Sequence, residues 1–129
     1  MTRNDFAERL LEKYRKNVEN SEDEAYLKRI VTVGQVMTGE TERRDVAVML
    51  HFFIRKTGLE KDEENIDKAK VLKDLYDCRT CVDHVSQLYV KGIMPAAGRD
   101  VFGLRHIVDE EEADAILERL FDKSKRILP

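Results

Sequence analysis

Apolar residues recur every three to four positions along most of the chain, as expected for helices that each bury one face. Near the N-terminus, for example, Phe6, Leu10 and Tyr14 follow one another at steps of four. No segment shows the alternation of apolar and polar residues that is typical of a strand. The pattern predicts an all-α protein of about six helices, over residues 4–17, 21–34, 42–56, 60–75, 77–92 and 109–121.

Residues that favour helix ends stand at several of these boundaries. Ser21-x-x-Glu24 is a capping-box pattern for the second helix, and Asp77 and Asp109 can serve as N-caps of the fifth and sixth. The acidic stretch 60–67 suits the start of a fourth helix, because negative charge is favourable at the positive end of the helix dipole. Glycine, which readily adopts the left-handed conformation that closes many helices, follows the second, third and fifth helices at Gly34, Gly58 and Gly92.

One stretch of the pattern occurs twice. Leu27-x-x-Ile30-x-x-x-Gly34 is repeated 58 residues later as Val85-x-x-Leu88-x-x-x-Gly92, and each copy is followed by a loop and a second amphipathic segment. No linker rich in Pro, Gly or Ser separates the two copies, and 129 residues suit one domain. We therefore expect a single helical domain over residues 1–129, with repeat-like units at about 22–58 and 75–121 around a shared core and an extra N-terminal helix.

The composition excludes several classes of protein. The net charge is −3, and acidic and basic residues are interleaved, so nothing marks a nucleic-acid-binding face. No apolar run approaches the roughly 18 residues of a membrane span. The N-terminal segment lacks a signal peptide, which favours a cytoplasmic protein, or a cell-surface protein only if a leader has been removed.

The second repeat-like unit resembles the S-layer homology module, a helix-loop-helix repeat of bacterial surface proteins. The aromatic-x-Asp-Val turn of that family is matched by the segment Leu75–Cys78, and its first helix by Val82-x-x-Val85-x-x-Leu88-x-x-x-Gly92-Ile93. Gly98, Phe102 and Leu104 are similar to the end of the family's loop. The resemblance implies a helical fold built from such repeats.

The first unit is similar to the family at its second helix, where Glu42-Arg43-Arg44-Asp45 stands for the Thr-Arg-Ala-Glu motif. In the second unit Asp109 occupies the place of that arginine, so the charge is reversed. The family commonly uses three repeats to bind an anionic cell-wall glycan, and this sequence shows two. The resemblance therefore implies a binding or scaffolding module, and the missing repeat favours self-association as a homo-oligomer.

Four arginines are the candidates for contact with an anionic ligand. Arg43 and Arg44 stand at a helix start, where backbone amides also attract anions, and Arg99 and Arg105 lie in the long loop before the last helix. A carboxylate of an anionic polysaccharide or of a protein partner would suit them. The alternative is that they pair with neighbouring acidic residues on a solvated surface.

The segment Cys78-x-x-Cys81-x-x-His84 is the sharpest chemical pattern. Two cysteines and a histidine at this spacing can bind zinc, with His51, His106 or Asp83 as a fourth ligand. A CxxC pair at a helix start can also cycle between dithiol and disulfide. The third interpretation is that both cysteines are buried structural thiols that replace apolar residues of the repeat.

No motif of a known catalytic class occurs in the sequence. We therefore expect a protein that is not an enzyme and needs no cofactor. The favoured function is a non-catalytic binding or scaffolding module. The alternatives are a small metal- or redox-responsive protein that uses Cys78, Cys81 and His84, and a helical protein-protein adaptor.

Overall fold

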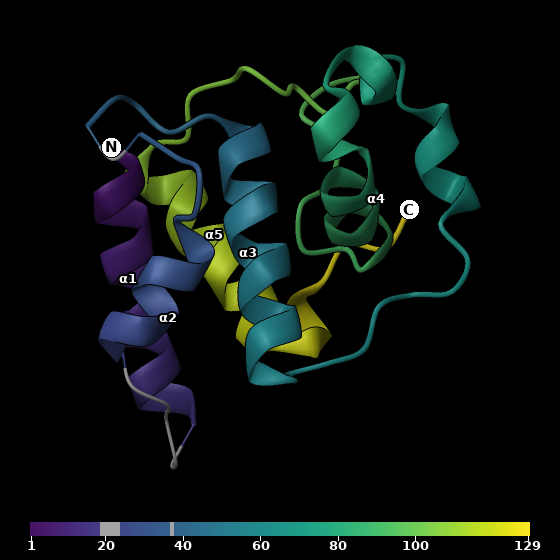
Figure 1. Ribbon diagram of the computed structural model, residues 1–129. Helices are drawn as coiled ribbons and strands as arrows, with labels where there is room; N and C mark the ends of the chain where they lie inside the picture. The colour runs from purple at the N-terminus through teal and green to yellow at the C-terminus, as the bar shows by residue number, and fades with distance from the viewer. Residues whose placement is uncertain (19–23, 37) are drawn as a thin grey trace.

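In the computed structural model, which describes residues 1–18, 24–36 and 38–129, these residues form five α-helices, with 3-10 turns between the third and fourth helices and after the fifth (Figure 1). The helices are α1 (Arg3–Asn17), α2 (Glu24–Val31), α3 (Arg43–Thr57), α4 (Val82–Val90) and α5 (Glu110–Phe121). Extended pairing within the described residues is limited to isolated bridges, such as that between Glu42 and Ile107. The all-α prediction is confirmed, whereas Ser21 and its capping box lie outside the described residues.

The first and last helices lie side by side. In Figure 1, α1, α2, α3 and α5 form one group, and α4 lies on the other side of α3. The guanidinium of Arg9 on α1 contacts the carboxylate of Asp114 on α5 at 2.7 Å. The buried apolar side chains form one cluster that extends from Phe6 to Leu120. The two repeat-like units and α1 therefore share a core.

Four predicted helix ends are confirmed by local geometry. The Asp109 side chain accepts a hydrogen bond from the Glu112 amide and caps α5. Gly58 ends α3 with a left-handed φ of 66°. Gly34 and Gly92 follow α2 and α4 with nearly equal φ values of 74° and 75°. The repeated glycine thus performs the same backbone task in both units.

The predicted fourth helix is wrong. Residues 60–66 run without helix, and only the 3-10 turns η1 (Asp67–Val71) and η2 (Leu75–Asp77) follow. The reason is a pairing with α4, in which the amide of Glu63 donates to the side-chain oxygen of Gln87, and the Gln87 nitrogen donates to the Glu63 carbonyl. These bonds satisfy the amide and the carbonyl of Glu63 outside a helix. The apolar residues Ala69, Leu72 and Leu75 of this stretch are nevertheless buried, and Ile66 is partly buried.

The predicted start of the fifth helix is also wrong. Asp77 does not cap it, because another 3-10 turn, η3 (Arg79–Cys81), intervenes and α4 begins at Val82 with Cys81 as its N-cap. Asp77 remains exposed on η2.

The C-terminal tail, residues 122–129, is tied to the end of α4. The amide of Ile127 donates to the carbonyl of Gly92 at 2.9 Å, and a Cβ placed on Gly92 would lie 2.9 Å from the Ile127 backbone. Nearby, the Glu60 carboxylate pairs with Lys91 at 2.9 Å and with Arg126 at 2.7 Å. Gly92 therefore meets two demands, a left-handed φ and the close passage of the tail.

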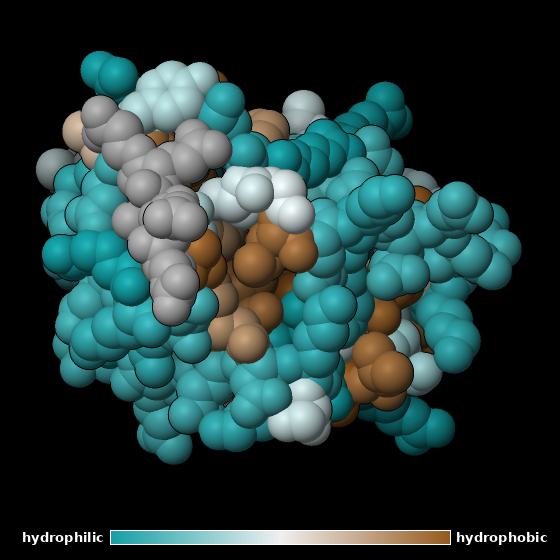
Figure 2. Space-filling view, turned by 90° about the horizontal axis from the view of Figure 1, so that it is seen from below, coloured by the Kyte–Doolittle hydropathy of each residue, from teal (hydrophilic) through white to brown (hydrophobic). Residues whose placement is uncertain are grey.

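Seen from below, the surface is mostly hydrophilic, and apolar side chains gather in a central hollow and in a smaller patch to its right (Figure 2). None of the helices in the described part of the chain is both long enough and apolar enough to span a bilayer.

Candidate functional site

The long loop between α4 and α5 is fixed by one carboxylate. Asp74, just before η2, accepts hydrogen bonds from the amides of Phe102, Gly103 and Leu104 at 2.8, 2.9 and 3.3 Å. Partial burial opposes ionisation of Asp74, but these amide bonds outweigh it and hold the pKa of its carboxyl below the ordinary value. The ionised carboxylate of Asp74 thus holds the loop in place.

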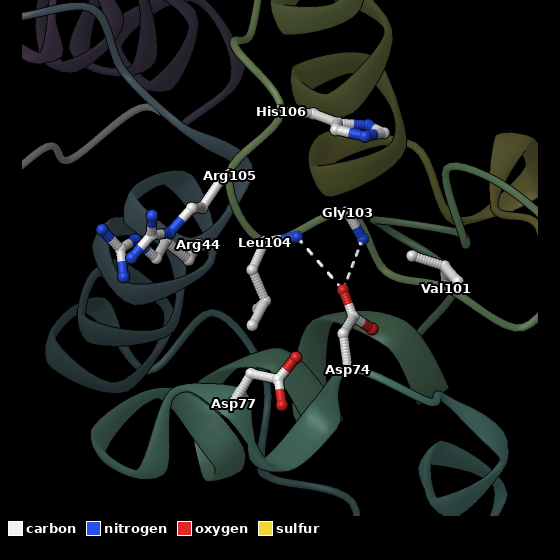
Figure 3. Close-up of a pocket in the computed structure, with 8 residues that line it drawn as sticks. All are labelled: Arg44, Asp74, Asp77, Val101, Gly103, Leu104, Arg105 and His106. Carbon is white, nitrogen blue, oxygen red and sulfur yellow. Dashed lines mark hydrogen bonds between the residues drawn. The ribbon is translucent and has the colours of Figure 1, made fainter.

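An open pocket of about 430 Å³ lies where this loop meets η2 and the start of α3 (Figure 3). We call it the loop pocket, and its lining residues are Arg44, Asp74, Asp77, Val101, Gly103, Leu104, Arg105 and His106. Residues of both repeat-like units therefore contribute to one site.

The loop pocket carries both basic and acidic side chains. Figure 3 shows Arg44 and Arg105 close together on one side and Asp77 below them, while the His106 ring points away. Arg44 pairs with Glu42 at 3.0 Å, and Arg105 and Asp77 are exposed. The site thus offers two neighbouring guanidinium groups at its rim and one accessible carboxylate.

Arg43 faces the protein interior instead. Its side chain is 4% exposed, its Nε donates to the Phe102 carbonyl at 2.9 Å, and its other nitrogens donate to the Pro95 carbonyl and to the Glu112 carboxylate. The guanidinium also lies 4.7 Å from the centre of the Phe102 ring, a cation–π distance. Arg43 therefore joins α3, two points of the loop and α5.

The four candidate arginines do not form one cluster. Arg44 and Arg105 meet at the loop pocket, Arg43 is buried beneath the loop, and Arg99 is exposed on the loop and does not line the pocket. The backbone amides at the start of α3 are occupied, because those of Arg43 and Arg44 donate to the carbonyls of His106 and Leu104. Any anion at this helix start has to be held by side chains.

The two cysteines are paired in a disulfide between Cys78 and Cys81, whose Cα atoms are 5.3 Å apart. Cys81 is buried with 5% exposure, and Cys78 is partly buried. The pair lies on η3, immediately before α4.

The structure also brings two histidines together. Nδ1 of His51 on α3 lies 2.9 Å from Nδ1 of His84 on α4, and Nε2 of His51 lies 2.8 Å from a carboxylate oxygen of Asp62. Asp62 also pairs with Arg55 at 2.9 Å. Burial lowers the pKa of both histidines, and for His84 the neighbouring His51 adds to this effect.

Sequence reasoning had proposed His51 as a partner of His84, but nothing in the sequence pointed to Asp62 or Asp74. Both carboxylates contact residues that are well separated from them in the sequence. The spacing of residues along the chain does not reveal such contacts. Of the other proposed zinc ligands, His106 lies at the loop pocket and Asp83 is exposed. In the described ranges no three His, Cys, Asp or Glu side chains are arranged to hold a metal ion.

Comparison of this chain with protein-family models, with curated proteins and with solved structures finds no significant match.

Proposed function

We propose that the protein is a non-catalytic binding module that holds an acidic group of an anionic polysaccharide at the loop pocket. The observation that supports this proposal is the convergence of Arg44 and Arg105, from two distant parts of the chain, on one open pocket. A guanidinium can donate two parallel hydrogen bonds to a carboxylate, so two adjacent arginines suit a chain of uronic or otherwise acidic sugars.

The chemistry of the loop pocket also favours binding over catalysis. Its lining residues include no Ser, Thr or Cys that could act as a nucleophile. One of its carboxylates, Asp74, is engaged by three amides, and the His106 ring points away from the others. The resemblance to S-layer homology repeats is consistent with a glycan ligand.

The test compares two arginines of the same loop. Arg105→Glu reverses a charge at the loop pocket, and Arg99→Glu makes the same change at an exposed position outside it. Electrophoresis through a native gel that contains polygalacturonate should retard the wild type and Arg99→Glu, but not Arg105→Glu. A neutral dextran gel controls for the altered mobility of the variants.

Two outcomes would contradict the proposal. If polygalacturonate fails to retard the wild type, the polysaccharide is the wrong ligand class, and binding of soluble polyglutamate instead would favour an acidic protein partner. If both variants lose retardation equally, the effect is one of overall charge and the loop pocket has no special role.

Self-association is a separate prediction, based on two repeat-like units where the resembling family commonly uses three. Light scattering at increasing protein concentration should show a mass above that of one chain. A monomer at the highest concentration would exclude it.

A further inference from the structure

The cysteine pair and the histidine pair occupy adjoining elements. Cys81 is the N-cap residue of α4, and His84 is the third residue of that helix. Residues three apart are neighbours on the surface of a helix, so Cys81 and His84 lie on the same side of the start of α4. The turn that ends at Cys81 packs against α3, which carries His51. The two cysteines and the two histidines therefore belong to elements that pack on one another.

The hydrogen bonds of His51 prepare its Nδ1 atom for a ligand. A carboxylate only accepts hydrogen bonds, so Nε2 of His51, which lies 2.8 Å from Asp62, carries the proton. Nδ1 of the neutral ring is then an acceptor, and its lone pair is directed at Nδ1 of His84. A carboxylate that orients a histidine from its far side is the usual second partner of a metal-binding histidine.

We propose that reduction of the Cys78–Cys81 disulfide completes a zinc site in which the two thiolates and the Nδ1 atoms of His51 and His84 are the four ligands. In the oxidised protein the sulfurs are bonded to each other, and only the two nitrogens remain. Two thiolates with two imidazoles form one of the standard tetrahedral zinc sites. This combination of soft sulfur and imidazole also disfavours calcium and magnesium, which bind oxygen.

The redox step balances with an external dithiol as reductant. The dithiol supplies two electrons and two protons, the sulfur–sulfur bond of Cys78 and Cys81 breaks, and the dithiol becomes a cyclic disulfide. Each cysteine thiol then releases its proton to solvent when it binds Zn²⁺. His84, which donates its Nδ1 proton to His51 before the metal ion binds, releases that proton to solvent and takes one up at Nε2, which frees its Nδ1 lone pair.

The required movement of the two rings is small. Two zinc–nitrogen bonds of about 2.0–2.1 Å at a tetrahedral angle hold their nitrogens roughly 3.3–3.4 Å apart. The Nδ1 atoms are now 2.9 Å apart. The rings therefore need to separate by about half an ångström.

The test uses the full chain, oxidised or reduced with a phosphine under anaerobic conditions. Reduced wild-type protein should bind about one Zn²⁺ per chain, measured by competition with a chromophoric chelator, and the oxidised protein should bind at least about tenfold more weakly. With Co²⁺ as a probe, the reduced protein should show the near-ultraviolet charge-transfer band of a cobalt–thiolate bond. This spectrum needs no variant and is independent of the loop pocket.

Two histidine variants separate the site from general metal binding. His84→Asn should weaken Zn²⁺ binding by about tenfold or more, whereas His106→Asn, a change at an exposed histidine of the loop pocket, should leave it unchanged. Equal Zn²⁺ affinity in the oxidised and reduced states would overturn the proposal. So would a cobalt complex without the thiolate band, or equal affinities of the two variants. If His84→Asn fails to fold, the wild-type cobalt spectrum decides alone.

Discussion

Replacing Arg43 with Ala should destabilise the protein far more than replacing its neighbour Arg44. The Arg43 guanidinium is bound to the carbonyls of Phe102 and Pro95 and to the Glu112 carboxylate. Its removal leaves two carbonyls and one carboxylate without their partner in a largely buried place. Breaking one partner out of a buried ion pair costs about 3–5 kcal/mol, because the remaining charge is uncompensated.

That cost is a large part of the free energy of unfolding of the whole domain. A domain of this size is stable by about 5–15 kcal/mol, so the Arg43→Ala variant should approach the limit of folding. The midpoint of thermal unfolding should fall by about 10–20 °C. Arg43→Lys should lie in between, since an ammonium keeps the attraction to Glu112 but lacks the planar fork that reaches both carbonyls.

The assay is urea unfolding followed by circular dichroism, with Arg44→Ala as the matched control. Arg44 is one-third exposed and pairs with Glu42, two residues away, so its loss should cost less than about 1 kcal/mol. If the two alanine variants unfold within about 1 kcal/mol of each other, Arg43 is not the link between the loop and the helices that its contacts indicate.

Three further outcomes follow from the packing. Because burial lowers the pKa of both hydrogen-bonded histidines below the ordinary 6.5, the unfolded chain takes up protons first. The urea midpoint should therefore be steady above pH 6.5 and fall as the pH decreases from there, less steeply in His84→Gln. Gly92→Ala should destabilise more than Gly34→Ala, because both have the same left-handed φ but only Gly92 faces the backbone of the C-terminal tail; equal urea midpoints would contradict the close contact. Asp74→Ala should speed hydrogen exchange at the three loop amides that it holds, whereas Asp77→Ala should leave them unchanged, and equal exchange in both variants would show that the loop is held by other contacts.

Periodicity predicted the helices that bury one apolar face. α1, α3 and α5 occur where the spacing of apolar residues placed them, Asp109 caps the start of α5, and Gly58 ends α3. The failure at residues 60–75 has a clear physical cause. An acidic stretch with inward apolar residues is compatible with a helix. Here, however, the side chain of Gln87, distant in sequence, binds both the amide and the carbonyl of Glu63.

The candidate site was likewise predicted only in part from the sequence. Sequence reasoning identified Arg44 and Arg105 but could not show that they share a pocket, because the loop that joins them is positioned by Asp74. It treated Arg43 and Arg44 as equivalent. A step of one residue on a helix turns the side chain by about 100°, and here this step separates a buried arginine from a pocket arginine.

The pairing of α1 with α5 has a consequence for how the chain acquires its structure. Arg9 and Asp114 are 105 residues apart, so their contact closes nearly the whole chain into one loop. The entropy lost in such a closure is regained only when many contacts form together, which favours one all-or-none transition. During synthesis, α1 can pack on α2 and α3 early, but the side of α1 that faces α5 stays uncovered until the last helix has left the ribosome. The core is therefore complete only when the whole chain has been synthesised.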